Sequence, residues 1–194
     1  YRSSRGLGDV YKRQTQGPEI RTAKNSEVLE LVKGEQIILS SKKTKDMKKS
    51  LQIDNLKYVK GIKKNGRISL DNGSIDLKIT RASKEKIYCD VLDNGQISGR
   101  KHVNFPGATI SLPTITDKDK RDLKFAASLG VDFVALSFCR TKNDINDLKK
   151  TLKSFKKEIE LFVKVEDQQG LSNLEDIVSS SDGIMVARGD LGIE

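Results

Sequence analysis

The sequence predicts an α/β protein: an incomplete (β/α)₈ TIM barrel that carries an inserted small all-β barrel domain. Two observations predict it. Short strand patterns divided by glycine-containing turns run from about residue 25 to residue 103, and several short strands at this spacing are typical of a small barrel or sandwich. From about residue 109 onward, helix and strand patterns alternate, which indicates parallel βα units.

The predicted β-domain shows its alternation most clearly around one turn. Residues 67–70 and 74–79 alternate polar with apolar side chains, as half-buried strands do. Between them, Asp71-Asn72-Gly73 predicts a hairpin turn, because Asn and Gly tolerate positive φ. Further strands are expected at residues 28–32, 36–40 and 87–92.

The second half of the chain changes to a helical period. A helix is expected from Asp117 to Leu129, with Thr116 as its cap and Gly130 at its end. The other expected elements, in chain order, are a strand at 131–138, a helix at 143–155, a strand at 159–166, a helix at 172–179 and a strand at 183–187. A complete barrel needs about 250 residues, so these units predict only a section of one.

These patterns divide the chain into four parts. Residues 1–14 read YRSSRGLGDVYKRQ, show no amphipathic period, and are interpreted as a non-native leader of adapter or vector origin; a flexible native tail is the alternative. Residues 15–24 are assigned to the barrel, residues 25–103 to the inserted β-barrel lid domain and residues 104–194 to the partial barrel.

The net charge of +9 raises the hypothesis of nucleic-acid binding, because clustered lysines neutralise phosphates. Aromatic residues make up only 5% of the chain and Trp is absent, so side chains for base stacking are scarce. We therefore favour a solvated lysine-rich surface, and no nucleic-acid partner. The lysines in question are Lys42, Lys43, Lys45, Lys48, Lys49, Lys57, Lys60, Lys63 and Lys64.

The chain shows no feature of a membrane or secreted protein. No window approaches the roughly 20 apolar residues of a membrane span, and no apolar signal-peptide core is present. Cys89 and Cys139 have no paired-ligand spacing. We therefore expect two reduced thiols, a cytoplasmic protein and no membrane partner.

Charged residues that could carry chemistry lie where two predicted barrel strands end. Lys164 and Glu166 are two positions apart and therefore point the same way. Asp190, about 24 positions further, follows the next strand, and Gly189 beside it leaves room for a ligand. Two carboxylates from adjacent strands suit Mg²⁺, and amides at a helix start can hold an anion. From spacing alone, a Lys–Glu pair that merely completes the barrel layer is equally well supported.

Five ordered motifs resemble those of the pyruvate kinase family. Residues 182–192 match its signature DGIMVARGDLG, and Phe162-Val163-Lys164-Val165-Glu166 is similar to its active-site strand. The other three are TQGPEIRT at residues 15–22, NFPG at 104–107 and FVALSF at 133–138, which resemble TKGPEIRT, NLPG and FVAxSF. The resemblance runs from Thr15 to Glu194, and it implies a glycolytic kinase.

The resemblance implies a role for each matching residue. Lys164 would be the catalytic residue, stabilising the transferring phosphoryl group and the enolate oxygen. Glu166 and Asp190 would bind Mg²⁺ or Mn²⁺, and the amides of Gly189 and Asp190 would receive the carboxylate of phosphoenolpyruvate or pyruvate.

The resemblance also implies contacts away from these strand ends. Arg21 and Lys101 would contact the phosphates of ADP or ATP, and the carbonyl of Thr15 would be one ligand of K⁺. His102 stands where the family often has Gly; we interpret it as a hinge-side surface residue rather than a general base. The parent protein would be a homotetramer.

Some family features differ or are missing. Val165 and Asp167 replace the usual Ile and Asn, and Gln14 replaces an Asp that would bind K⁺. An upstream strand with a phosphate-binding Arg and an Asn-x-Ser-His motif, a downstream proton-delivering Thr, the other barrel strands and the regulatory domain are absent. We therefore expect the chain to be an inactive fragment.

Two other classes of function stay open. One is a Mg²⁺-dependent lyase or aldolase barrel acting on pyruvate or phosphoenolpyruvate, although the inserted β-domain favours a nucleotide-using enzyme. The other is a basic, non-catalytic nucleic-acid-binding module.

Overall fold

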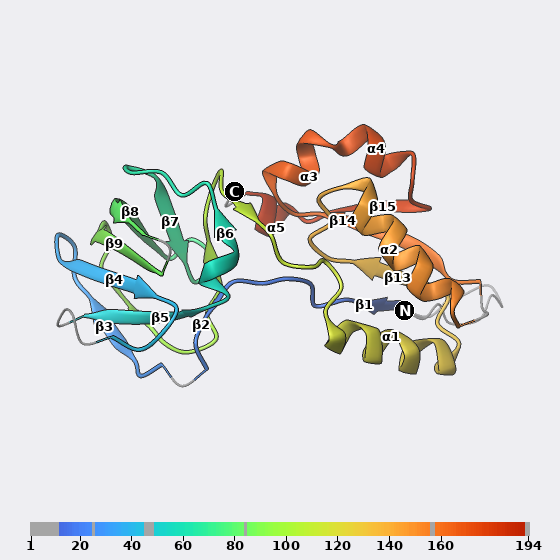
Figure 1. Ribbon diagram of the computed structural model, residues 1–194, viewed down its shortest axis with the longest axis horizontal. Helices are drawn as coiled ribbons and strands as arrows, with labels where there is room; N and C mark the ends of the chain where they lie inside the picture. Colours follow the sequence, from blue (N-terminus) through green and yellow to red (C-terminus); the bar gives the residue numbers. More distant parts are fainter. Residues whose placement is uncertain (1–11, 25, 45–48, 84, 156–157, 193–194) are drawn as a thin grey trace, which may run out of the picture. The chain divides into compact units, whose positions relative to one another are not determined.

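The computed structural model describes residues 12–24, 26–44, 49–83, 85–155 and 158–192. The chain divides into two compact units, one of Tyr1–Pro18 with Pro113–Leu191 and one of Glu19–Leu112 with Gly192–Glu194 (Figure 1). The division falls outside the predicted lid boundaries of 25 and 103, because strands before and after that range join the β-sheets of the second unit.

The first unit is built on a four-stranded parallel sheet. Its order is β1 (Lys12–Gln14), β13 (Phe133–Leu136), β14 (Glu160–Val165) and β15 (Gly183–Val186), and all three pairings are parallel. Parallel neighbours joined by helical crossovers are the arrangement expected of a barrel section. The predicted partial barrel is confirmed.

Strand β1 lies within the predicted leader. Lys12, Arg13 and Gln14 pair in register with Phe133, Val134 and Ala135, so these three residues occupy a strand position beside β13. Residues 1–11 lie outside the described part of the chain. The non-native origin of residues 1–14 stays a prediction.

The described part of the first unit contains five helices. They are α1 (Asp117–Leu129), α2 (Lys142–Lys153), α3 (Gln168–Ser172), α4 (Leu174–Val178) and α5 (Arg188–Leu191). Leu123 of α1, Leu148 of α2 and Ile177 of α4 share one buried cluster with alternate side chains of β13 and β14. Right-handed crossovers between parallel strands place helices in this way. The single helix predicted at 172–179 is instead two short helices that meet at Asn173.

Helix α1 begins and ends where its sequence predicted. Thr116 accepts a hydrogen bond from the Asp119 amide, and the Asp119 side chain accepts from Thr116 in return, which is a capping box. Gly130 ends the helix with φ of 74°, a conformation that glycine adopts at low cost. Asp119 also accepts the Gln16 amide at 2.8 Å, so this cap fixes the chain that follows β1.

The second unit is a small β-barrel. Its seven-stranded sheet has the order β11-β7-β8-β9-β4-β5-β2, and two short two-stranded ribbons, β10 with β3 and β12 with β6, complete the unit. The strands are β2 (Arg21–Thr22), β3 (Leu29–Leu31), β4 (Gln36–Ser40), β5 (Ser50–Asp54), β6 (Val59–Lys60), β7 (Arg67–Leu70), β8 (Ile75–Ala82), β9 (Lys86–Val91), β10 (Gly95–Ile97), β11 (Val103–Asn104) and β12 (Thr109–Ile110).

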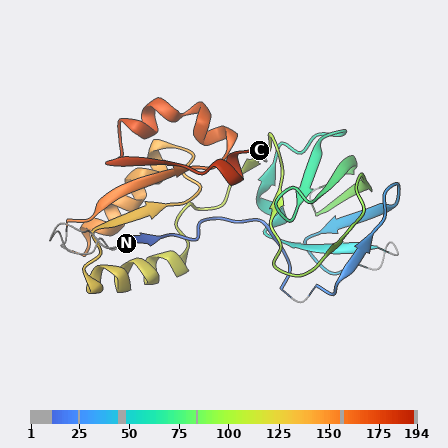
Figure 2. The ribbon, with the colours of Figure 1, turned by 180° about the vertical axis from the view of Figure 1, so that it is seen from behind.

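The two edges of that sheet meet and nearly close it. A bridge joins Arg21 to His102, and the Val103 amide donates to the Ile20 carbonyl at 3.0 Å. Closure removes exposed strand edges, and the interior is filled by an apolar cluster drawn from both halves of the barrel. Figure 2 shows the curved sheet from the opposite side.

The predicted hairpin at Asp71-Asn72-Gly73 connects β7 to β8. All three residues have positive φ, 50°, 56° and 87°. The two strands then pair in antiparallel register from Leu70 opposite Ile75. Among the described residues, no helix has the length and apolar character required to cross a membrane.

Replacing Asp119 by Ala is expected to lower the free energy of unfolding of the first unit by about 2–3 kcal/mol, because the amides of Thr116 and Gln16 lose the buried carboxylate that accepts their hydrogen bonds. Urea unfolding followed by circular dichroism measures this. Asp117→Ala is the control: its carboxylate is exposed on the same helix turn, and a change of less than about 0.5 kcal/mol is expected. Equal effects of the two changes would contradict the assignment.

Stability is also expected to fall at high pH because both cysteines are buried. Burial raises the pKa of the Cys89 and Cys139 thiols to about 12, whereas unfolded thiols ionise near pH 8.5. The raised folded pKa stabilises the protein below about pH 9, and this contribution is lost as pH rises towards 12, at up to about 1.4 kcal/mol per pH unit for each thiol. Unfolding curves at pH 8 and pH 10.5 measure it, and the Cys89→Ala/Cys139→Ala variant should show a smaller slope.

Candidate active site

The charged pair predicted from strand alternation lies at the carboxyl end of β14. Leu161, Val163 and Val165 point towards the helices and are buried. Lys164 and Glu166 therefore point to the other face of the sheet, which becomes the inside of a barrel. The Lys164 ammonium forms an ion pair with Oε1 of Glu166.

Glu166 is almost completely buried. Its side chain is 1% exposed, compared with 14% for Lys164. Its second oxygen, Oε2, accepts a hydrogen bond from the Phe138 amide at 2.6 Å. One carboxylate thus joins the end of β14 to the turn that follows β13, and each of its oxygens has a donor.

The turn after β13 has a strained backbone. Phe138 has φ of 51°, in the left-handed region that costs a bulky residue roughly 1–2 kcal/mol. This conformation directs its amide at Glu166. Gly17 lies against the turn with φ of 75°, and a Cβ atom there would come within 2.9 Å of the Phe138 ring and 3.3 Å of Ser137.

Burial determines the protonation tendency of Glu166. Removal from water raises the pKa of its carboxyl above the ordinary value, and the negative charge of Asp190 acts in the same direction. The hydrogen bonds from Lys164 and Phe138 and the Lys164 charge oppose the rise in pKa without cancelling it. The carboxylate is therefore placed where an added positive charge would stabilise it.

Asp190 follows β15, on the one-turn helix α5 (Arg188–Leu191). Its negative charge raises the pKa of the Glu166 carboxyl. Such an interaction is expected between side chains at the ends of adjacent parallel strands. Gly189 has free space: a Cβ atom there would meet no atom within 4 Å. Packing of the described chain therefore does not require glycine at this position.

Glu166 and Asp190 could hold a hard cation with help from other oxygens. Among the described residues, no group of three or more His, Cys, Asp or Glu side chains is placed to hold a metal. Two carboxylates alone leave most of an octahedral shell to water and substrate oxygens, which is how Mg²⁺ is commonly bound. The two carboxylates therefore suit Mg²⁺ or Mn²⁺, which keep several water or substrate oxygens as ligands, rather than a metal that is held wholly by protein side chains.

Thr15 lies buried beside the same turn. Its carbonyl accepts the Ser137 hydroxyl at 2.7 Å, and its own hydroxyl accepts the Ser137 amide at 2.9 Å. Thr15 is 4% exposed. Since a carbonyl oxygen can accept two contacts, this one could also face a cation.

Arg21 and Lys101 come together in the second unit, at the closure of its barrel. The Thr22 amide donates to the Lys101 carbonyl at 2.9 Å, and Nη1 of Arg21 donates to the Arg100 carbonyl at 2.6 Å. Each side chain has an acidic partner, Glu19 for Arg21 and Asp71 for Lys101. Both are partly exposed, so their charges are accessible to an anion.

His102 forms the barrel bridge to Arg21, and its carbonyl accepts the Asp71 amide at 2.9 Å. Its backbone thus belongs to the closure of the β-unit. The interpretation of His102 as a hinge-side surface residue rather than a general base stays a prediction.

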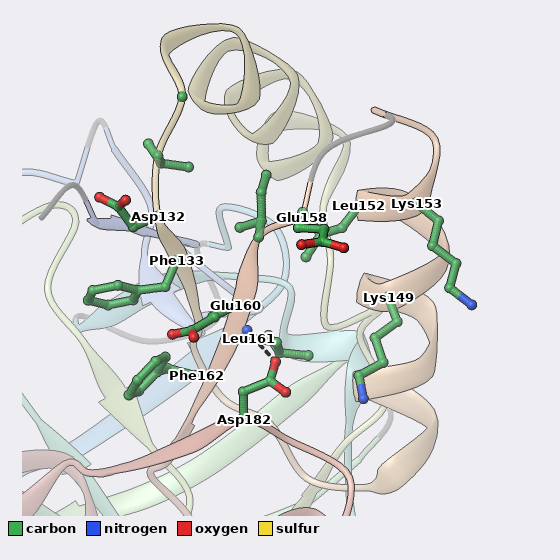
Figure 3. A pocket seen from close by; sticks show the side chains of 13 residues that line it. Asp132, Phe133, Lys149, Leu152, Lys153, Glu158, Glu160, Leu161, Phe162 and Asp182 are labelled. Carbon is green, nitrogen blue, oxygen red and sulfur yellow. Dashed lines mark hydrogen bonds between the residues drawn. The ribbon is translucent and has the colours of Figure 1, made fainter.

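A separate pocket lies at the amino ends of β13 and β14 (Figure 3). Its volume is about 1170 Å³. The Phe133 and Phe162 rings lie together there, with centroids 4.6 Å apart, and Gly183 is needed because a Cβ atom would come within 2.4 Å of the Phe162 ring. Lys164, Glu166 and Asp190 do not line it, and in barrels of this type chemistry occurs at the other end of the strands.

The sequence did not reveal two residues that hold the charged pair in place. Ser137 and Phe138 act through backbone and hydroxyl contacts to Thr15 and Glu166. The sequence signals were the polar Ser137 at the end of an apolar strand and the FVALSF motif at residues 133–138, which contains both residues without indicating their contacts. A positive φ at a phenylalanine leaves no sequence signal.

The chain matches a known family over most of its length. The family model described as the pyruvate kinase barrel domain matches residues 10–194. That range includes β1 and the last five residues of the predicted leader.

Curated relatives agree with this match. The pyruvate kinases of Staphylococcus epidermidis and Staphylococcus aureus are 38% and 37% identical over 183 residues, and that of Staphylococcus saprophyticus is 39% identical over 184 residues. In each case the aligned region is 93% of this chain and 31% of the relative. The chain therefore spans about a third of the length of the relatives it matches.

Replacing Gly17 by Ala is expected to destabilise the first unit by about 2–3 kcal/mol, because the methyl group adds a contact with the Phe138 ring to the cost of positive φ. Gly130→Ala is the matched control, since Gly130 has φ of 74° and open space around its Cβ position; about 1 kcal/mol is expected. Urea unfolding measures both. A Gly17→Ala cost no larger than the control would show that the turn tolerates a side chain.

Proposed function

Because this chain belongs to the pyruvate kinase family, we propose that it is part of an enzyme that transfers a phosphoryl group from phosphoenolpyruvate to ADP, giving pyruvate and ATP. The observation that carries the proposal is the buried Lys164–Glu166 pair at a barrel strand end, with the Asp190 charge beside it. The lysine and the two carboxylates are the charges that such a transfer needs.

Lys164 is the proposed catalytic residue. Phosphoryl transfer depends mainly on stabilising charge on the moving group and on the oxygen left behind. In the free chain the Lys164 ammonium is paired with Glu166, which orients it along the inner face of the sheet. With substrate present, this ammonium would donate to the phosphoryl oxygens and then to the enolate oxygen.

Glu166 and Asp190 are the proposed ligands of Mg²⁺ or Mn²⁺. The cation, when bound, would supply positive charge that stabilises the transferring phosphoryl group. Two observations support the pair: the raised pKa of the buried Glu166 carboxyl, which a positive charge would relieve, and its mutual repulsion with Asp190. The amide of Phe138 keeps Oε2 of Glu166 fixed in this role.

The substrate carboxylate is proposed to bind the amides of Gly189 and Asp190. The first amides of a helix have no acceptor within it, and α5 begins at Arg188. The open space at Gly189 supports this assignment. Thr15 is proposed to offer its carbonyl to K⁺, at a position that the Ser137 hydroxyl fixes.

Arg21 and Lys101 are proposed to bind the phosphates of ADP or ATP, and the β-unit to act as a lid that excludes water. Nearly all of the net charge of +9 comes from residues 19–112, so this unit has the electrostatics that a polyanionic nucleotide requires. The whole enzyme is proposed to be a cytoplasmic homotetramer, in which the rest of the barrel completes the site. The present chain is expected to be inactive without it.

The alternatives are distinguishable. A lyase or aldolase would need no nucleotide, so product formation that does not require ADP would support it. A nucleic-acid-binding module would bind RNA or DNA in a salt-dependent way without any role for Lys164. The family match across both units favours the kinase.

Replacing Lys164 by Ala, in a polypeptide extended to the length of the relatives, is expected to lower kcat by at least about 100-fold. The physical reason is loss of the positive charge that faces the transferring group. Pyruvate formation from phosphoenolpyruvate and ADP, measured with and without Mg²⁺, tests this.

Lys150→Ala is the control, because that lysine is 77% exposed on α2 and pairs only with Asp147 at the surface; no change in rate is expected. Full activity in Lys164→Ala would sink the proposed mechanism. Activity that persists after removal of divalent cations would sink the roles of Glu166 and Asp190.

A further inference from the structure

Arg140 is a buried charge two residues beyond the strained Phe138. It is 7% exposed. Its guanidinium donates to the Thr114 hydroxyl at 2.8 Å and lies 3.9 Å from the Asp144 carboxylate. A buried guanidinium without partners would cost several kcal/mol, so these contacts fix the side chain.

The backbone of Arg140 is held as firmly as its side chain. Its amide donates to Asp144 at 3.0 Å, and its carbonyl accepts from the Asn173 side chain at 2.9 Å. Asp144 belongs to the capping box that begins α2, and Asn173 lies where α3 meets α4. One residue thereby ties the turn after β13 to elements on both sides of it.

A second carboxylate is within the electrostatic influence of the same guanidinium. Asp167, which accepts the Gly170 amide at 2.7 Å as the cap of α3, interacts electrostatically with Arg140. Asp167 is the neighbour of Glu166 in the chain, but it points to the helix side of the sheet. Arg140 therefore contributes to fixing both ends of the Glu166 environment, the turn at Phe138 and the start of α3.

We propose that Arg140 is a positioning residue, which holds the turn of residues 137–141 so that the Phe138 amide stays directed at Oε2 of Glu166. The left-handed backbone at Phe138 persists only if its surroundings enforce it. Gly17 packs against one side of the turn, and the Arg140 contacts anchor its other end.

The consequence for the cation rests on the proposed function. If the turn relaxes, Glu166 loses the Phe138 donor and is left with Lys164, the cation it already pairs with. Mg²⁺ or Mn²⁺ would then have to bind a carboxylate that is less firmly oriented. Loss of residues that orient metal ligands typically weakens metal binding by 10–100-fold.

The experiment compares this chain with its Arg140→Met and Thr114→Val variants. Arg140→Met removes the charge and its hydrogen bonds, whereas Thr114→Val removes one partner and keeps the charge, so it remains informative if the first variant fails to fold. Leu148→Ala is the matched control, since Leu148 is fully buried on α2 in the apolar cluster of the same unit and makes none of these polar contacts.

Two measurements are made on each protein. Amide hydrogen exchange of Phe138, followed by NMR, reports the turn directly, and paramagnetic resonance of Mn²⁺ reports metal affinity without any turnover. We expect Phe138 exchange to accelerate at least about tenfold in Arg140→Met and less in Thr114→Val. Mn²⁺ affinity should fall about tenfold or more in Arg140→Met and be unchanged in Leu148→Ala.

The outcomes separate the two proposals. Unchanged Phe138 exchange in both variants overturns the positioning role, as does equal acceleration in Leu148→Ala. Faster exchange with no Mn²⁺ binding by the unmodified chain supports the positioning of the turn and counts against the metal role of Glu166 and Asp190. Faster exchange with unchanged Mn²⁺ affinity overturns the link between the turn and the cation.

Discussion

The contacts of the Glu166 carboxylate are the constraint around which the first unit is arranged. A carboxylate that is 1% exposed must find partners for both oxygens, and here one comes from its own strand and one from the turn after the neighbouring strand. The left-handed Phe138, the glycine beneath it at position 17 and the polar ties of Arg140 all follow from supplying that second partner.

The contacts of Glu166 also explain why the site is rigid although it holds two carboxylates and only one ammonium group. Parallel strands bring their carboxyl ends to one edge, so side chains distant in sequence meet without a long loop. The apolar cluster behind them fixes the strands, and the capping boxes of α1 and α2 fix the chain on either side. Lys164 and Glu166 then lie on the face of the sheet opposite the helices, and the Asp190 charge acts on Glu166; a cation and an anionic substrate would complete the balance of charge there.

The β-unit is organised by a sheet that nearly closes on itself, whereas the first unit is organised by helices packed on a sheet. Its two sheet edges meet at Arg21 and His102, which places Lys101, just before β11, beside β2 and its Arg21. Acidic partners hold each of them in the free chain. An incoming phosphate would therefore exchange one anion for another, and the net positive charge of the unit would favour the exchange.

Local sequence patterns determined the elements. Alternation set the strands, Thr116 and Gly130 set α1, Asp71-Asn72-Gly73 set the hairpin, and spacing put Lys164 and Glu166 on one face; each depends only on neighbouring residues. The tertiary structure decided the break at Asn173, the closure of the β-barrel, the left-handed Phe138 and the buried contacts of Arg140 and Thr15. These features join residues far apart in the chain, and their free energy comes from burial that a local pattern does not encode.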